Sequence, residues 1–149
     1  MRIVVQRVRE ASVTVDSIPV ATIQKGVVLL VGVGRGDTES DAVTLASKTA
    51  NLRIFADNSG QMSCSLLEVK GKALVVPNFT VYGDCRKGRR PSFANAAPPE
   101  EANMLFQSFC TALESEEICV ARGVFGAHML VQMKNDGPVT LLLDSRREF

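Results

Sequence analysis

Gly26-Val27-Val28-Leu29-Leu30-Val31-Gly32-Val33-Gly34 is the stretch of sequence that decides the fold. Its core is apolar without interruption and glycines flank it, a pattern typical of a β-strand that is buried on both faces. The run is far shorter than the roughly 20 residues that a membrane-spanning helix needs. It therefore predicts the central strand of a sheet.

Short runs rich in β-branched residues lie on both sides of this central strand. Asp16-Ser17 separates two of them and predicts a turn, so the N-terminal runs predict a meander of short strands. Asp57-Asn58-Ser59-Gly60 predicts a second turn. The runs that predict strands cover residues 3–8, 12–15, 20–23, 52–55, 65–67, 73–81, 119–125 and 129–133.

Two segments carry the signals of helices. Thr38 suits a helix start, with Asp41 as its capping partner, and the prolines and acids at residues 98–101 suit the first turn of a second helix. Largely apolar side chains follow each start at helical spacing, which predicts one buried face per helix. They are Ala42, Leu45, Ala46, Thr49 and Ala50 in the first helix and Ala102, Leu105, Phe106, Phe109 and Leu113 in the second.

Strands outnumber helices in this pattern, and most connections are too short for parallel crossovers. We therefore expect an α+β fold in which antiparallel sheets form a barrel-like or sandwich core with two main helices. A chain of 149 residues suits one domain, so a single domain over residues 1–149 is predicted.

Composition narrows the possible functions. Lys and Arg number 17 against 16 Asp and Glu, so any contact with nucleic acid must come from a local basic patch. The four cysteines form no CxxC pair and accompany a single histidine, which predicts neither a zinc site nor disulfides. Polar residues interrupt the N-terminal run before a signal-peptide core could form. A cytoplasmic protein with no metal, no cofactor and no membrane partner is expected.

Val76-Pro77-Asn78-Phe79-Thr80-Val81 is the first segment that could carry chemistry. Pro and Asn are disfavoured in central strands, so something other than sheet propensity places them there. Broken pairing would free backbone N–H groups around Asn78 and Phe79 to hold an oxyanion, with Thr80 offering a hydroxyl. A bulged edge strand explains the same residues without any function.

Arg86-Lys87-Gly88-Arg89-Arg90 is the second such segment. Four cations in an otherwise neutral chain suit phosphate binding, because arginine grips oxygen atoms in pairs and glycine lets the backbone approach. A solvated surface loop is the alternative interpretation.

Asn135-Asp136-Gly137-Pro138-Val139-Thr140 is the third. Asp-Gly between two apolar runs predicts a hairpin turn. The Gly-Pro pair offers backbone that can approach a ligand closely, although the segment alone favours an ordinary turn with a proline that blunts a sheet edge. His128 and Met129 precede this segment, and a lone histidine beside methionine is expected to be structural rather than a catalytic base.

Taken together, these residues closely resemble the D-aminoacyl-tRNA deacylases, also called D-tyrosyl-tRNA deacylases. The similarity covers nearly the whole length. It is carried by residues 1–8, 51–55, 86–93, 96–100, 125–129 and 135–140.

The resemblance implies a homodimer with the active site at the subunit interface. Gly137-Pro138, in a cis bond, would reach from one subunit into the pocket of the other, where its carbonyl groups exclude the side chain of an L-aminoacyl group. Arg7 matches the residue that holds those carbonyls in place. The family's second motif is usually Ser-Gln-x-Thr-Leu, and Pro77-Asn78-Phe79-Thr80-Val81 stands in its place here.

The function that follows is hydrolysis of the ester of D-aminoacyl-tRNA, and of mischarged glycyl-tRNA, without a cofactor. Asn78, Phe79 and Thr80 would be the catalytic residues, Gly137, Pro138 and Arg7 would select the chirality, and Pro77 and Met129 would line the substrate pocket. Arg86, Lys87, Arg89 and Arg90 would hold phosphates of the aminoacyl-tRNA. Two alternatives stay open: a deacylase with relaxed chirality, which Pro77 favours, and a non-catalytic RNA-binding homologue.

Overall fold

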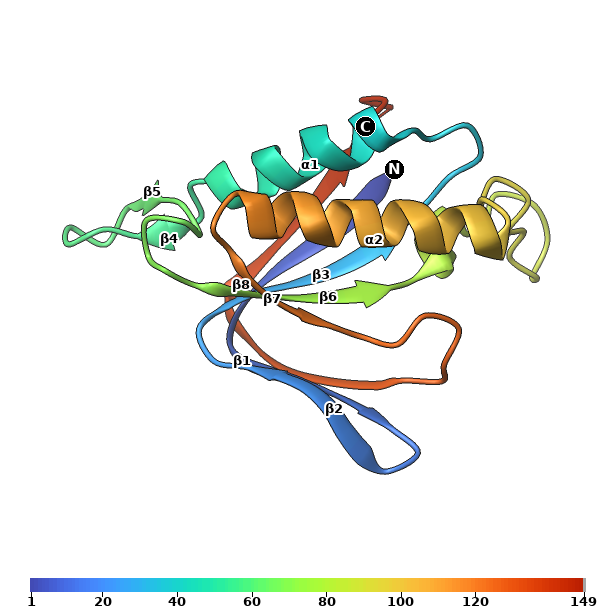
Figure 1. Ribbon diagram of the computed structural model, residues 1–149. Coiled ribbons are helices and arrows are strands. Elements are labelled where there is room, and N and C mark those ends of the chain that lie inside the picture. Colours follow the sequence, from blue (N-terminus) through green and yellow to red (C-terminus); the bar gives the residue numbers. More distant parts are fainter. Residues whose placement is uncertain (149) are drawn as a thin grey trace.

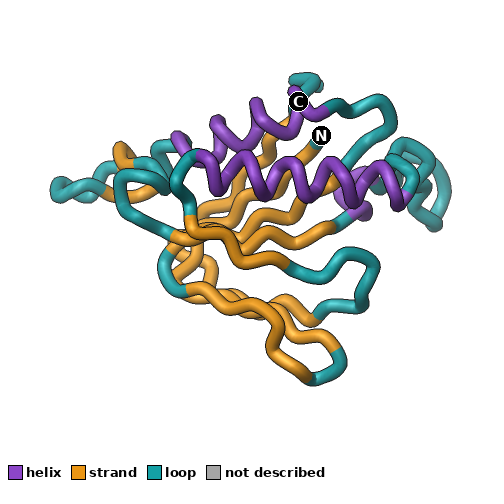
Figure 2. The backbone as a smooth tube through the Cα atoms, viewed as in Figure 1, coloured by secondary structure: helices purple, strands orange, loops and turns teal. Residues whose placement is uncertain are grey.

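The computed structural model describes residues 1–148 and contains one large sheet with two helices packed side by side over one of its faces (Figures 1 and 2). The large sheet has the strand order β2-β1-β3-β6-β7, and β8 pairs with the other side of β1. The strands of this sheet are β1 (Arg2–Val15), β2 (Ile18–Ile23), β3 (Gly26–Gly32), β6 (Lys72–Pro77), β7 (Cys119–Arg122) and β8 (Leu130–Asp144). The remaining elements are α1 (Glu39–Asn51), α2 (Pro99–Ser115), the 3-10 helix η1 (Phe79–Tyr82) and a small hairpin of β4 (Phe55–Ala56) and β5 (Met62–Cys64).

β3 is the central strand, as predicted. It pairs antiparallel with β1 and parallel with β6, and six of its seven residues are buried. The expected α+β class with two main helices is also confirmed. The sheet is mixed, however, and not antiparallel throughout, because α1 and α2 each return the chain so that β6 and β7 start in the same direction as β3.

The alternation of side chains along β3 divides the interior into two cores. Val27, Leu29 and Val31 face the helices and join the larger core. Val28 faces the opposite side, where the far half of β1 and β2 curl under the sheet and β2 contacts β6 and β7 (Figure 1). This curl gives the barrel-like shape that the sequence predicts.

The predicted hairpin at Gly137-Pro138 is wrong. β8 runs through this segment as one strand and stays antiparallel to β1 on both sides of it, since Asn135 pairs with Val8 and Thr140 pairs with Gln6. Residues 136–139 therefore face Arg7 alone and form a bulge, which we call the Gly-Pro bulge. Asp136, Gly137 and Pro138 loop out of the strand but do not reverse its direction. The direction is kept because both halves of β8 pair with the same strand, β1.

Helix starts were predicted better than the short strands between them. The backbone N–H and the hydroxyl of Thr38 both donate to the Asp41 carboxylate, and Pro99 opens α2. Several predicted strands differ in extent: residues 3–8 and 12–15 belong to one long strand, β1, and β7 ends at Arg122 instead of residue 125. Residues 65–67 form a turn before β6, and only Phe55 of residues 52–55 lies in a strand.

Candidate active site

The predicted strand over residues 73–81 ends early, at Pro77. The N–H of Asn78 still donates to the carbonyl of Val31 (2.8 Å), and the next residue starts η1. The side-chain oxygen of Asn78 caps this turn, because it accepts from the backbone N–H (3.2 Å) and the hydroxyl (2.5 Å) of Thr80. Asn78 thus sits where a strand changes into a helical turn.

The three backbone N–H groups predicted to hold an oxyanion are not equivalent. Those of Asn78 and Thr80 already have acceptors, in Val31 and in the Asn78 side chain. Within the described part of the chain, the N–H of Phe79 has no acceptor. The Thr80 hydroxyl donates to an amide oxygen, which is not a base, so this contact does not activate it as a nucleophile.

A pocket of about 580 Å³ opens beside this turn, between the ends of β3 and β6 and the start of α2. Its walls are mostly apolar and include several aromatic rings, with Phe79 and Phe93 packed edge to face at 5.0 Å between ring centroids. Among the described residues that line it, Arg35 alone carries a charge. We call it the apolar pocket, and its shape and lining suit a flat, uncharged ring system.

Pro77 and Met129, both predicted to line the substrate pocket, meet at Gly123. A Cβ atom at Gly123 would lie 2.9 Å from the Met129 sulfur and 3.3 Å from Cδ of Pro77. Pro77 also lines the apolar pocket, whereas Met129 does not. Sequence reasoning missed Gly123, although a glycine inside a predicted strand, here residues 119–125, is a signal of close backbone approach.

Side chains from β1 and β8 form hydrogen bonds with the backbone of the Gly-Pro bulge. Arg7 donates from Nε to the carbonyl of Asp136 (3.0 Å) and from a terminal nitrogen to the carbonyl of Ile54. Asn135 accepts from the N–H of Val139 (3.0 Å) and donates to its carbonyl (3.3 Å). The Gly137–Pro138 peptide bond is cis. Arg7 therefore donates a hydrogen bond to the carbonyl of Asp136, the residue before Gly137, and not to the carbonyls of Gly137 and Pro138.

A single chain does not bring the Gly-Pro bulge and the Asn78 turn together. Arg7, which faces the bulge, pairs with Val27 of β3, whereas Pro77 pairs with Val31 of the same strand. Four residues of strand span about 13 Å. The bulge also lies beyond β1, on the other side of β3 from β6. The two predicted halves of the site therefore face different regions of the molecule.

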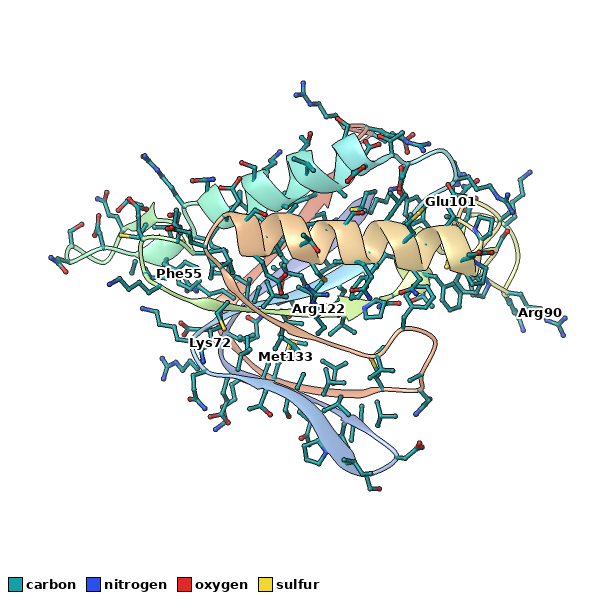
Figure 3. The ribbon with its side chains drawn as sticks, in the orientation of Figure 1. Phe55, Lys72, Arg90, Glu101, Arg122 and Met133 are labelled. Atoms are coloured by element: carbon teal, nitrogen blue, oxygen red, sulfur yellow. The ribbon has the colours of Figure 1, made fainter. Side chains whose placement is uncertain are left out.

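The run of cations at residues 86–90, called the basic loop, projects from the structure between the bridged residues Asp84 and Ser92, and Arg90 points away from the body of the molecule in Figure 3. Arg86 forks onto Asp84 with two hydrogen bonds, of 2.9 and 2.7 Å, and these bonds lower the pKa of Asp84 to about 2. Within the described residues, Lys87, Arg89 and Arg90 form no ion pair. Among the described residues, three of the four side chains predicted to bind phosphate are therefore not engaged in an ion pair.

Other kinds of site find little support in the described residues. No group of three or more His, Cys, Asp or Glu side chains there is arranged to hold a metal ion. His128 is exposed and lies outside the apolar pocket. No helix among these residues has the length and apolar character to cross a membrane.

Comparisons with known proteins agree on one family. The family model described as D-Tyr-tRNA(Tyr) deacylase matches residues 4–144. A D-aminoacyl-tRNA deacylase of Thermosipho melanesiensis is 53% identical over the full length of both chains. One of Roseiflexus castenholzii is 57% identical over 97% of this chain and 92% of its own.

Two solved structures share the fold. The c-Myc DNA Unwinding Element Binding Protein has a TM-score of 0.91 and 38% identity, over 97% of this chain and 98% of its own. A probable eukaryotic D-amino acid tRNA deacylase has a TM-score of 0.79 at 19% identity, over 95% of this chain and 97% of its own, which shows similarity of fold alone.

Proposed function

The chain belongs to the D-Tyr-tRNA(Tyr) deacylase family, and on that basis we propose that it hydrolyses the ester of D-aminoacyl-tRNA and of mischarged glycyl-tRNA in the cytoplasm. The products are a free amino acid and tRNA. One observation carries the mechanism: Phe79 lines the apolar pocket, and its N–H has no acceptor among the described residues.

In this mechanism water attacks the ester carbonyl and the developing oxyanion accepts a hydrogen bond from the Phe79 N–H. Asn78 contributes indirectly, because its side chain engages Thr80 and holds η1 in place. Thr80 orients the aminoacyl group. No base contacts Thr80 among the described residues, so the vicinal 2′-hydroxyl of the substrate ribose assists the water, as the family resemblance suggests.

The apolar pocket would hold the 3′-terminal adenosine. Single-stranded RNA ends are commonly recognised by stacking of unpaired bases on aromatic side chains. Phe79, Phe93 and Phe125 supply such rings around the pocket. Base and ribose in this pocket would place the 3′ ester near the Phe79 N–H.

Two copies of the chain would complete the site. An apolar row crosses the sheet on the face away from the helices, because Leu142 pairs with Val4 and Val4 pairs with Leu30. Leu142 is 60% exposed, and a second copy could cover it. A symmetric interface there would let each copy's Gly-Pro bulge approach the partner's Asn78 turn, which a single chain keeps apart.

Chirality would be selected by exclusion. Gly137 has no side chain and its exposed backbone could lie against the Cα of the bound aminoacyl group, leaving no room for a side chain of L configuration. Arg7 and Asn135 would keep this backbone in position through their bonds to residues 136 and 139.

A matched pair of substitutions tests the oxyanion donor. Phe79→Pro removes the free N–H, and proline suits the first position of a helical turn that follows an extended residue such as Asn78. Phe79→Ala keeps the N–H and removes only the ring. We expect kcat for D-Tyr-tRNA to fall about a hundredfold in Phe79→Pro relative to Phe79→Ala. Equal rates in the two variants would contradict this role.

Pro77 favours a second candidate, a deacylase with relaxed chirality, because it lacks the hydroxyl and N–H of the usual serine. Rates on D-Tyr-tRNA, Gly-tRNA and L-Ala-tRNA separate the two. The D-specific proposal expects hydrolysis of the first two only, and equal rates on D and L substrates would establish the second candidate. Tight binding of D-Tyr-tRNA without any hydrolysis would instead identify an RNA-binding homologue.

A further inference from the structure

A second, smaller pocket of about 180 Å³ adjoins the apolar pocket, and we call it the arginine pocket. Arg35 lines both pockets, and the consecutive residues Asn95 and Ala96 line one each, so the two pockets share a wall. The lining of the arginine pocket is polar and consists of Arg2, Arg35, Tyr82, Asn95, Arg146 and Glu148.

The charged groups of this lining are three guanidinium groups and one carboxylate. Buried acids behind the pocket hold two of them in place: Arg146 bonds Asp37 (3.0 Å) and Arg2 bonds Asp144 (3.3 Å). A guanidinium has five N–H donors, so these anchors leave Arg146 with donors to spare. The charge of Asp37 is already balanced by the amino group of Met1, at 2.7 Å. Arg2 is paired with Glu148 (2.5 Å) as well as with Asp144, so Arg35 and Arg146 are the cations of the lining that an anion would contact.

Arg35, on the shared wall, is held by a backbone carbonyl and not by an acid. Its Nε donates to the carbonyl of Ala94 (2.8 Å), and within the described residues its two terminal nitrogens make no hydrogen bond. The Tyr82 hydroxyl donates to the Asp37 carboxylate (3.4 Å), and burial together with that carboxylate raises the pKa of the hydroxyl, so Tyr82 adds no negative charge to the pocket. Paired N–H groups of arginine match the oxygens of a phosphate well.

We propose that the arginine pocket binds the phosphate on the 5′ side of the terminal adenosine, with Arg35 and Arg146 as its principal contacts. This inference rests on the proposed function, which places the adenosine in the apolar pocket. The 5′-phosphate is joined to the ribose ring through only C5′ and O5′, so it lies close to a nucleoside bound in the apolar pocket. Arg35 lines both pockets and is therefore within reach of both the nucleoside and its phosphate. The site would thus recognise a nucleotide by its base and its phosphate in two adjoining cavities.

Binding of small probes to the full-length protein tests the site without any need for catalysis. Calorimetry with adenosine 5′-monophosphate, adenosine and inorganic phosphate is the measurement. We expect the monophosphate to bind about tenfold more tightly than adenosine, the gain of one charged hydrogen-bonding contact. Equal affinities would overturn the proposal. Inorganic phosphate that binds as tightly as the monophosphate would also overturn it, in favour of a free-anion site.

Three variants sharpen this test. Arg35→Gln should abolish the tenfold preference for the monophosphate over adenosine, whereas the control Lys48→Gln, which removes an exposed cation from α1, should change neither affinity. Loss of both affinities in Arg35→Gln would contradict a phosphate-specific role. Glu148→Gln removes the competing carboxylate and should raise monophosphate affinity about twofold, a gain that misfolding cannot produce. No gain would count against the proposal.

Hydrolysis of D-Tyr-tRNA by the same wild-type preparation separates this proposal from the proposed function. Hydrolysis without a preference for the monophosphate would reject the phosphate site and keep the deacylase. A preference for the monophosphate without hydrolysis would keep the site and reject the deacylase.

Discussion

At the scale of single residues, Asn78 determines the backbone geometry of the candidate site. Its N–H completes the pairing of β6 with β3, and its side chain takes the donors of Thr80. The next N–H along, that of Phe79, is left without an acceptor among the described residues. The contacts of Asn78 thus leave one backbone N–H group, that of Phe79, available at the end of β6. The longer side chain of the family's usual Gln is absent here.

Gly137→Ala should disrupt the Gly-Pro bulge. Gly137 has a φ of +133°, and a Cβ there would lie 2.8 Å from the Val139 side chain and 3.0 Å from the Arg7 guanidinium. We expect a loss of about 1–2 kcal/mol of stability and of most deacylation, measured by thermal unfolding and by hydrolysis of D-Tyr-tRNA. Gly60→Ala is the matched control, since its φ is +83° but nothing lies within 4 Å. Equal activity in both variants would argue against a role for the bulge.

Cys110 should resist alkylation in the folded protein. Burial raises the pKa of its thiol to about 12, so at pH 8 almost none of it is the reactive thiolate. Cys85 and Cys119 are exposed. Iodoacetamide at pH 8 should therefore label Cys85 and Cys119 within minutes and Cys110 only after unfolding, as read by mass spectrometry of peptides. Fast labelling of Cys110 in the native protein would show that α2 opens.

At the scale of elements, β8 is the informative strand. It pairs with β1 along nearly its whole length, yet residues 136–139 face only Arg7. The extra backbone is looped out and then closed by Asn135, whose side chain bonds both polar backbone groups of Val139. The paired parts of β8 on both sides thus hold the Gly-Pro bulge, whose backbone is looped out of the strand.

Asn135→Ala should therefore loosen the bulge while sparing the strand. The N–H of Val139 would lose its acceptor, which we expect to cost about 1–2 kcal/mol in the free energy of unfolding. The discrimination between D-Tyr-tRNA and L-Ala-tRNA should fall as the backbone gains freedom. Gln132→Ala, at an exposed position of the same strand, should change neither quantity. Unchanged discrimination in Asn135→Ala would mean that Arg7 alone holds the bulge.

At the scale of the whole molecule, the distribution of features over the surface points to an assembly. The Asn78 turn and the Gly-Pro bulge lie apart on one chain, on either side of the apolar row formed by Leu142, Val4 and Leu30. A two-fold axis through this row would exchange the two features between copies. The helices cover the opposite face of the sheet, and the curl of β1 and β2 under this face leaves Leu142 exposed (Figure 1).

Leu142→Asp should split the proposed dimer. Leu142 is exposed in the single chain, so the fold should survive, but a buried aspartate at the interface would be unpaired. Sedimentation velocity should show a monomer, and deacylation should fall with it. Val43→Asp changes an exposed apolar residue of α1 and should leave a dimer. A monomeric wild type, or a monomeric Leu142→Asp variant with full activity, would refute the shared site.

The basic loop should set the salt dependence of tRNA binding. Replacing Arg89 and Arg90 together by Gln should reduce the slope of log affinity against log salt by about 1.4 to 1.8, from the loss of two phosphate contacts. Arg86→Gln should change it less, because Arg86 is already paired with Asp84. Filter binding at several salt concentrations measures both. A slope unaffected by the double substitution would place the RNA elsewhere.

The sequence by itself determined the central strand, the start of both helices and the family, because burial on both faces, the Thr38 cap and the motifs are written in residues close together along the chain. The tertiary structure decided the rest. Pairing of both halves of β8 with β1 made the predicted hairpin a bulge, and the crossovers through the helices made the sheet mixed. The Val31 carbonyl accepts from the N–H of Asn78, and the next N–H, that of Phe79, has no acceptor among the described residues. These outcomes depend on partners distant in sequence, and local residue patterns carry no information about which strand a segment will meet.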